Sequence, residues 1–204
     1  MEFKFPLTCV VSGPTRSGKT EFVKRLIKSN LVSPPPERII WCYGQWQDGY
    51  KDLVGVEMIE GLPDIQMLKS DKSRKLLVCD DLMQAYDSKN DDMNTLFCAG
   101  SHHWNLGLIH IVQNLFYGKM RTARINCSHI VLLKNPSDRL QVMSLARQLY
   151  PTNQKYLVES FDDATSLPYG HLVIDMDPRT ADDMRLRTSV FDEIGYVYQP
   201  KNYK

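Results

Sequence analysis

Apolar runs alternate with amphipathic stretches along most of the chain. Short apolar runs bounded by turn residues predict strands, and apolar residues at helical spacing predict helices. The expected strands are Leu7–Val11, Arg38–Tyr43, Val56–Ile59, Lys75–Cys79, Leu106–Val112, His129–Leu133 and His171–Asp175, which is the last. The expected helices are Lys19–Ser29, about Leu82–Ala99, Ser137–Leu149 and Gln154–Ala164.

Several of these strands are apolar almost throughout, among them residues 76–79, 109–112 and 130–133. Strands without a polar face are usually buried on both sides. Their alternation with helices predicts an α/β fold with a mostly parallel central sheet and helices on both faces. We expect a single domain over residues 1–204, with its core at about 7–177 and a polar C-terminal extension at about 178–204.

Composition excludes some classes of protein. With 25 Lys and Arg against 24 Asp and Glu, the formal net charge is +1, which excludes a globally basic nucleic-acid coat. The 43% hydrophobic content argues against disorder. No apolar run is long enough to span a membrane, and the N-terminus does not resemble a signal peptide, so we expect an intracellular protein that is not secreted. Five cysteines without metal-ligand spacing are expected to be reduced.

The strongest chemical motif follows the first expected strand and opens the first expected helix. It fits G-x-x-x-x-G-K-[ST] and predicts a phosphate-binding loop. Backbone N–H groups of such a loop surround the phosphates, and the helix directs its positive end at them. The expected nucleotide-binding residues are Gly13, Pro14, Thr15, Arg16, Ser17, Gly18, Lys19 and Thr20. Lys19 is expected to bridge the β- and γ-phosphates of ATP, and Thr20 to ligate Mg²⁺. A chance glycine-rich turn is the alternative.

Two carboxylates end the apolar strand at residues 76–79. We expect Asp80 to hold the Mg²⁺ shell and Asp81 to polarise the attacking water as general base. The alternatives are a strand-end turn for Asp80 and a helix N-cap for Asp81. Gln113 ends the strand at 106–112, and its amide can donate to and accept from a water beside the nucleotide. Its alternative is an amide that bonds its own loop.

The motifs of GTPases and transporter ATPases are absent from the sequence. An additional strand between the P-loop strand and the Asp80 strand is typical of RecA-like ATPases, and Arg38–Tyr43 is the candidate for that position. The P-loop, Cys79-Asp80-Asp81-Leu82-Met83 and Val112-Gln113-Asn114 together resemble the FtsK–HerA superfamily of DNA-pumping ATPases.

Later segments make this resemblance more specific. They are similar to genome-packaging ATPases of double-jelly-roll DNA viruses and Polinton/Maverick-like elements. The segments are His102–Gly107, Lys134–Arg139, Leu145–Gln148, Asp163–Thr165, Pro168–Gly170 and Arg185–Thr188. The resemblance implies a RecA-like P-loop NTPase that forms a homo-oligomeric ring and drives double-stranded DNA into a capsid, using ATP and Mg²⁺. It implies phosphate and metal roles for Lys19, Thr20 and Asp80, and a sensor role for Gln113. Many members have Glu where this chain has Asp81.

Rings of this kind also use an arginine from the next subunit, and Arg121, Arg124 and Arg139 are candidates. Residues 119–139 hold Lys119, Lys134 and these three arginines against one acid, Asp138. Such an excess could stabilise γ-phosphate charge across an interface or follow a DNA backbone, and the alternative is a solvated basic face. Two other functions stay open, a small-molecule kinase and a nucleotide-dependent assembly factor that acts on capsid protein without moving DNA.

Overall fold

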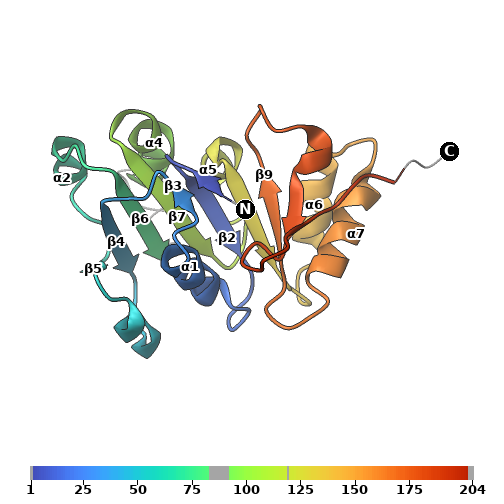
Figure 1. The fold of residues 1–204 in the computed structure, drawn as a ribbon, viewed down its shortest axis with the longest axis horizontal. Helices are drawn as coiled ribbons and strands as arrows, with labels where there is room; N and C mark the ends of the chain where they lie inside the picture. The colour runs from blue at the N-terminus through green and yellow to red at the C-terminus, as the bar shows by residue number, and fades with distance from the viewer. Residues whose placement is uncertain (1, 83–91, 119, 202–204) are drawn as a thin grey trace.

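The structure is a computed structural model that describes residues 2–82, 92–118 and 120–201. Within these residues, nine strands form one sheet in the order β11-β10-β9-β8-β2-β7-β6-β4-β5 (Figure 1). The central strands and one side are β8 (His129–Leu133), β2 (Thr8–Ser12), β7 (Leu106–Val112), β6 (Lys75–Asp80), β4 (Arg38–Tyr43) and β5 (Glu57–Glu60). The other side is β9 (His171–Asp175), β10 (Leu186–Thr188) and β11 (Tyr196–Val197).

The strands from β8 to β5 are all parallel to their neighbours, whereas β9, β10 and β11 are each antiparallel to the preceding one. This confirms the predicted α/β fold with a mostly parallel sheet. The prediction that His171–Asp175 is the last strand is wrong, because β10 and β11 extend the sheet. They are short edge strands in which only Leu186 is buried, so they carry little apolar signal.

The strand between the P-loop strand and the Asp80 strand is β7, not β4. Strand β7 pairs with β2 through Ser12 and Val112 and with β6 through Asp80 and Ile111. Strand β4 lies on the far side of β6, and its burial is incomplete, whereas β7 is buried along its whole length. The sequence contained this difference, since the run at 106–112 is the more apolar of the two.

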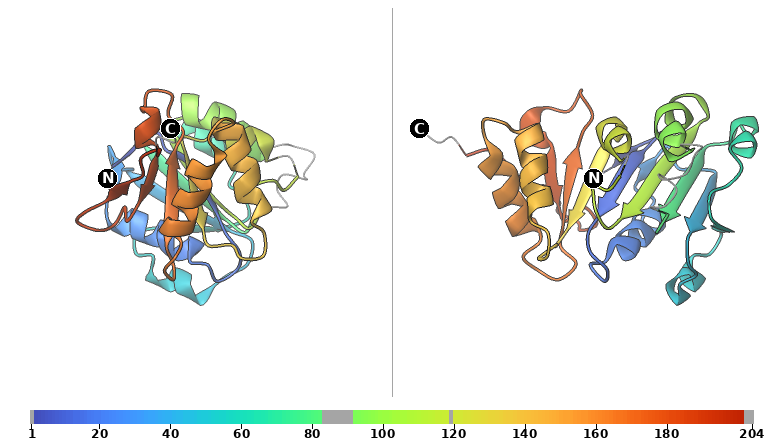
Figure 2. Two further views of the ribbon diagram at one scale, coloured as in Figure 1. Left: turned by 90° about the vertical axis from the view of Figure 1, so that its right-hand side faces the viewer. Right: turned by 180° about the vertical axis from the view of Figure 1, so that it is seen from behind.

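Helices cover both faces of the sheet, as predicted (Figures 1 and 2). Helix α1 (Lys19–Lys28) packs Phe22, Val23 and Leu26 against one face. The opposite face is covered by a separate hydrophobic cluster that includes residues from α5, α6 and α7. These helices are α5 (Arg121–Asn126), α6 (Leu140–Leu149) and α7 (Gln154–Ala164). Burying both faces explains why the central strands lack polar alternation.

The helical stretch expected at about 82–99 is described from Asp92 onward. It comprises α3 (Asp92–Thr95), a π-helical turn at Leu96–Gly100 and α4 (Ser101–His103), so it ends later than expected. Its expected first part, residues 83–91, lies outside the described residues. Short elements without a clear period were not predicted. They are β1 (Phe3–Lys4) paired with β3 (Val32–Ser33), α2 (Ile65–Ser70), α5, and 3₁₀ turns at Asp48–Asp52 and Asp182–Met184.

Cys98 is exposed, whereas the other four cysteines are buried free thiols, in keeping with their apolar context. Among the described residues, no helix has the length and apolar character required to cross a bilayer.

Candidate functional site

The P-loop connects β2 to α1 at the carboxyl edge of the parallel strands. Arg16 and Gly18 both have positive φ, 64° and 99°, which gives the loop its tight turn. A Cβ on Gly13 would lie 2.6 Å from Ser17 Oγ, so only glycine leaves the loop its curvature there. The loop is therefore shaped by its two glycines, as the motif predicts.

Two observations fit this loop to an anion. No side chain among the described residues caps the N-terminus of α1, so its first N–H groups are not satisfied by a capping residue. Ser17 Oγ is buried and has no hydrogen-bond partner within the described part of the chain. Buried polar groups without partners are rare, and here they surround a helix N-terminus that favours negative charge. The residues present therefore fit a bound phosphate chain.

The Lys19 ammonium bends back over the loop and donates to the Pro14 carbonyl oxygen at 2.8 Å. Burial lowers the pKa of Lys19, and the neighbouring carboxylates of Asp80 and Asp81 oppose this effect. A cation held in a partly desolvated position interacts strongly with an arriving anion. The Lys19 ammonium therefore lies at the loop where the sequence predicts a phosphate contact, and that role stays a prediction.

Asp80 and Thr20, the two predicted metal ligands, are in direct contact. The Thr20 hydroxyl donates to Asp80 Oδ2 at 3.0 Å. Burial raises the pKa of Asp80, and hydrogen bonds from Tyr50 and Thr20 together with the Lys19 charge lower it. A carboxylate beside a hydroxyl at a phosphate loop is an oxygen donor set that suits Mg²⁺. The pair fits a divalent cation held beside the phosphates.

Tyr50 is a site residue that the sequence did not reveal. Its hydroxyl donates to Asp80 Oδ2 at 3.0 Å, and its ring packs 5.5 Å from that of Trp41. The segment that carries Tyr50 is held by Lys24 of α1, whose Nζ lies 3.0 Å from the Gly49 oxygen and 3.2 Å from Asp52 Oδ2. The available signal was the density of aromatic residues between Trp41 and Tyr50.

Asp81 is exposed and has a positive φ of 57°. A Cβ on Gly44 would lie 2.7 Å from the Asp81 carbonyl oxygen, so a glycine permits this close approach. Left-handed backbone in an aspartate is uncommon, and such strain is frequent at functional sites. The alternative role of Asp81, capping a helix that would start in residues 83–91, falls outside the described residues.

Gln113 directly follows β7, beside the start of the P-loop. The Gly13 N–H donates to the Val112 oxygen at 3.3 Å, which joins the two segments. The Gln113 side chain is exposed and makes no hydrogen bond with any other described residue. The alternative in which the amide bonds its own loop therefore has no support within the described part of the chain.

The three candidate arginines have different surroundings. Arg124 is buried, donates from Nη1 to the Leu115 oxygen at 3.0 Å and stacks over the Phe116 ring. The Arg139 guanidinium is bound to Asp162 at 2.7 and 2.9 Å. Arg121 is exposed and forms no ion pair in the described parts of the chain. Arg124 is thus committed to its own chain, while Arg121 is accessible.

A second polar network that the sequence did not reveal fixes the segment after Gln113. Gln141 Nε2 donates to Asp138 Oδ2 at 2.7 Å, and its Oε1 accepts the Leu115 N–H at 2.9 Å. Arg124 donates to the Leu115 carbonyl, so both the N–H and the carbonyl of Leu115 are hydrogen-bonded by side chains. The network links the loop after β7 to the loop after β8.

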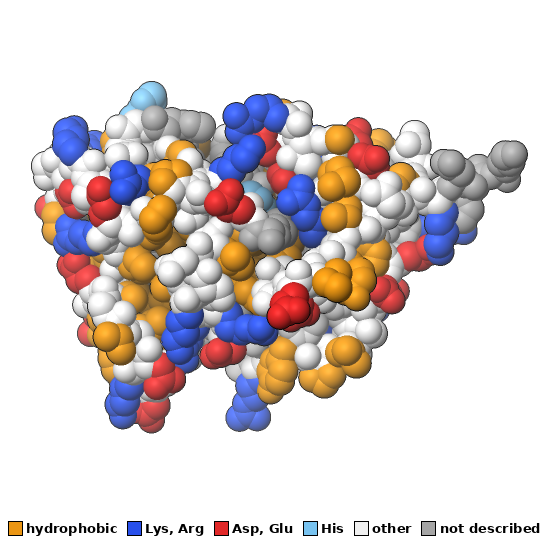
Figure 3. All heavy atoms as spheres, viewed as in Figure 1, with side chains coloured by type: hydrophobic (Ala, Val, Ile, Leu, Met, Phe, Trp, Pro, Cys, Tyr) orange, Lys and Arg blue, Asp and Glu red, His pale blue; other side chains and the backbone are white. Residues whose placement is uncertain are grey.

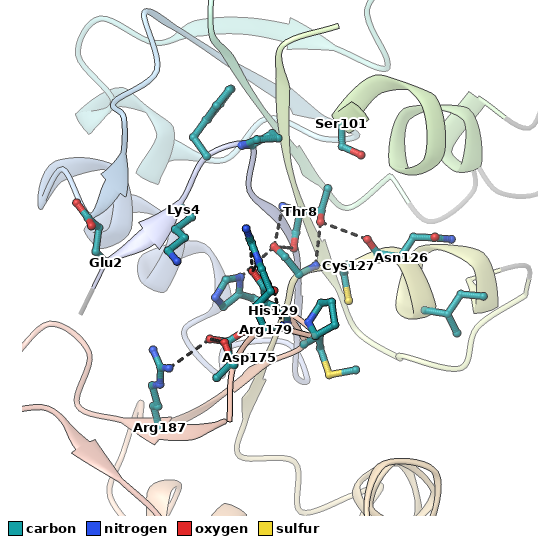
Figure 4. Close-up of a pocket in the computed structure, with 18 residues that line it drawn as sticks. Glu2, Lys4, Thr8, Ser101, Asn126, Cys127, His129, Asp175, Arg179 and Arg187 are labelled. Carbon is teal, nitrogen blue, oxygen red and sulfur yellow. Dashed lines mark hydrogen bonds and ion pairs between the residues drawn. The ribbon is translucent and has the colours of Figure 1, made fainter. Parts of the chain in front are cut away.

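A cavity of about 610 Å³ lies at the opposite, amino edge of the sheet (Figure 4). Ser128 Oγ donates to the Thr8 oxygen at 2.8 Å, accepts the Thr8 N–H at 3.1 Å and lies 3.0 Å from His129 Nδ1. Arg187 pairs with the buried carboxylate of Asp175 at 3.3 Å. None of the residues predicted to bind the nucleotide lines this cavity.

No protein-family model matches the sequence. No curated protein sequence matches it either. Solved structures of similar fold include the genome packaging NTPase B204 from Sulfolobus turreted icosahedral virus 2 in complex with ATP-gammaS, with a TM-score of 0.61 at 13% identity over 96% of this chain and 98% of that chain. B204 from Sulfolobus turreted icosahedral virus, described as a DNA-packaging ATPase, has a TM-score of 0.59 at 14% identity over 98% and 100%.

The cytoplasmic domain of the type VII secretion ATPase EccC from Thermomonospora curvata is also similar, with a TM-score of 0.51 at 10% identity. The match covers 96% of this chain and 24% of that chain. At such low identities the likeness concerns the fold. The chain has a P-loop NTPase fold with a mostly parallel, mixed sheet, shared with the viral packaging NTPase B204.

Proposed function

We propose that this chain is an ATPase that packages double-stranded viral DNA into a capsid inside the host cell. The observation that carries the ATPase part is the contact between Thr20 and Asp80 at the mouth of the P-loop, with Lys19 beside them. Mg²⁺ in this position would neutralise phosphate charge. Lys19 would bind the β- and γ-phosphates, and the loop N–H groups would orient the chain of phosphates.

Asp81 and Gln113 stand at adjacent strand ends and would orient the attacking water. Strands β6 and β7 are neighbours, so both residues emerge at the same edge of the sheet. Asp81 would accept the water proton, and the Gln113 amide would hold its orientation. Asp81→Asn is expected to leave ATP binding intact and to block hydrolysis, measured by nucleotide titration and by phosphate release. Normal hydrolysis by this variant would exclude Asp81 as the base.

A homo-oligomeric ring would bring an arginine of one subunit to the phosphates of the next. Arg121 is the strongest candidate because it is exposed, whereas Arg124 is buried and Arg139 is paired with Asp162. Mixing active subunits with Arg121→Ala subunits is expected to inhibit turnover more steeply than their fraction. Arg147→Ala, another exposed arginine, is the matched control and should dilute the activity in proportion.

DNA translocation is supported by the fold of B204, which is described as a DNA-packaging ATPase. The exposed cations Arg121 and Lys134 are candidate contacts for the DNA backbone. Duplex DNA should stimulate ATP hydrolysis, and the stimulation should decline steeply with salt because phosphate contacts release counterions. Phosphate transfer to a small acceptor would instead indicate a kinase. Binding to capsid shells without DNA stimulation would indicate an assembly factor.

A further inference from the structure

The ring of Tyr169 lies against the P-loop although it comes from a distant part of the chain. A Cβ on Gly18 would lie 2.8 Å from Tyr169 Cδ1. The side chain is nevertheless 72% exposed, so the face of the ring is open to solvent beside the phosphate loop. An exposed aromatic ring at this position is not needed to complete the core, and it leaves a flat apolar surface for a ligand.

The position of Tyr169 is fixed by the turn that connects α7 to β9, which lies at the same edge of the sheet as the P-loop (Figure 1). A Cβ on Gly170 would overlap the Ala164 and Leu167 carbonyl oxygens, so the turn is tightly packed. The next residue, His171, packs its ring 4.9 Å from that of Phe22 on α1. Because α1 begins in the P-loop, this contact ties the Tyr169 turn to the phosphate site.

The sheet order gives the site a direction. Asp80, the proposed metal ligand, ends β6, and Gln113, the proposed water-orienting residue, follows β7. Both strands lie on one side of the P-loop strand β2. The other side of β2 is occupied by β8 and β9. A nucleoside triphosphate with its γ-phosphate toward Asp80 therefore directs its nucleoside toward β8 and β9, where Tyr169 lies.

Space for such a group adjoins Tyr169. A cavity of about 670 Å³ is bounded by Tyr169, Phe191 and Tyr196, with Arg25 and Ser189 at its polar positions. This volume is within the range of small-molecule sites, and mixed aromatic and polar walls are typical of them. Figure 3 shows hydrophobic side chains gathered along this lower part of the face, where Leu167 and Ile194 are also exposed.

We propose that Tyr169 is the platform on which the base of the bound nucleotide stacks, with the adjoining cavity receiving the base edge. The inference rests on the proposed ATPase function and names the part of the site that recognises the nucleoside. Stacking uses the flat face that every base has, so the platform favours nucleotides over bare polyphosphate without selecting one base. The Tyr169 hydroxyl has no part in it.

The test compares ATP with inorganic tripolyphosphate, which has the phosphates but no base. Variants Tyr169→Ala, Tyr169→Leu and Tyr169→Phe all keep a non-glycine residue at the positive φ of 62°, so their backbone cost is similar. Tyr169→Ala and Tyr169→Leu are expected to raise the Kd for ATP about tenfold, equivalent to about 1.4 kcal/mol. Tyr169→Phe should bind ATP like the wild type, and tripolyphosphate affinity should be the same in all four proteins.

Each contrary outcome has a separate meaning. If the variants lose affinity for both ligands equally, Tyr169 supports the loop rather than the base, and the inference is wrong. Unchanged or tighter ATP binding by Tyr169→Ala would overturn it as well, since the ring would then only cover the loop. If the wild type binds tripolyphosphate and ATP equally well, the base has no platform, yet phosphate binding still stands. Failure of the wild type to bind either ligand would reject the proposed function itself.

Discussion

The two edges of the central sheet differ in how completely their polar groups are satisfied. At the carboxyl edge, Ser17 Oγ is buried without a hydrogen-bond partner among the described residues, and burial lowers the pKa of Lys19. At the amino edge, Ser128 Oγ bonds both polar backbone groups of Thr8 and lies beside His129 Nδ1, and Asp175 is paired with Arg187. Unsatisfied polar groups and strained backbone lower stability, and they are found mainly at functional sites, where a ligand can satisfy them. The contrast supports the proposal that ligands bind at the first edge, while the second edge holds neighbouring strands together.

The largest expected effect is the loss of ATP hydrolysis when Lys19 at the carboxyl edge is replaced. Lys19→Ala should reduce ATP hydrolysis by at least about 10²–10³-fold, because a charge aimed at the developing phosphate charge is lost. The thermal midpoint without nucleotide should not fall, since burial disfavours the ammonium in the folded state. Phosphate release and a thermal melt of the same sample measure both. Turnover near that of the wild type would show that Lys19 does not contact the phosphates during hydrolysis.

The next largest effect is expected at the amino edge, where a variant should lower stability and leave hydrolysis unchanged. Ser128→Ala removes the side-chain partner shared by the Thr8 N–H, the Thr8 carbonyl and the His129 ring, while the Thr8 carbonyl still accepts the Ser128 N–H at 2.8 Å. We expect the free energy of unfolding to fall by about 2–3 kcal/mol, measured by denaturant titration. Hydrolysis per folded molecule should not change. A variant of wild-type stability that has lost activity would reverse the assignment of the two edges.

Acid should weaken the amino edge through His129. Burial lowers the pKa of His129 to about 4, from 6.5, while Asp175 opposes and Arg187 adds to the effect. The unfolded chain therefore binds more protons between these values, and stability is lost as pH falls from 6.5 toward 4. At pH 5 the loss is about 2 kcal/mol, since one pKa unit corresponds to about 1.4 kcal/mol.

Other buried histidines also titrate, so a variant isolates this one. The pKa of His110 is lowered to about 3 and that of His171 is also lowered, in both cases by burial. His129→Asn keeps an N–H donor for Ser128 and removes the titrating ring. Its acid unfolding curve, followed by circular dichroism, should be less steep than that of the wild type between pH 6.5 and 4. Superimposable curves would show that His129 does not contribute.

The smallest expected effect is a reduced ATP affinity when Tyr50 at the carboxyl edge loses its hydroxyl. Tyr50→Phe removes one hydrogen bond to Asp80 and keeps the ring packed on Trp41. We expect the affinity for ATP to fall about three- to tenfold in the presence of Mg²⁺, or about 1 kcal/mol, and less in its absence. Tyr43→Phe changes a neighbouring ring of the same cluster and serves as the control. Equal losses in both variants would indicate general loosening rather than a role at Asp80.

The sequence predicted the parts of the site that depend on local chemistry. Residues 13–20 fit a phosphate-loop motif after a strand, and a carboxylate at the end of a buried strand requires a partner, so the residue types favoured a site that brings Thr20 and Asp80 together. The contact between these two residues confirms that they lie together. The buried parallel strands were also predicted from the sequence, because burial on both faces leaves no alternation of apolar and polar residues.

What the sequence did not predict depends on long-range packing. Tyr50 contacts Asp80 from a segment that Lys24 holds through the Gly49 carbonyl, and no local pattern encodes that contact. In the sequence, Arg124 is one of several basic residues in a run. In the structure it donates to the Leu115 carbonyl and stacks on the Phe116 ring. The position of β4 outside β6 was not predicted. The run at 106–112 is more apolar than the run at 38–43, but this difference was too small to decide strand order from sequence alone.

Helix α1 carries Lys19 and Thr20 at its start and, one turn later, Lys24, which grips the segment bearing Tyr50. Tyr50 and Thr20 in turn hold the same oxygen of Asp80. The residues proposed to bind phosphate and metal are thus connected by one network of hydrogen bonds. A displacement at Asp80 would therefore move α1 and the segment bearing Tyr50 together, because these contacts connect all three.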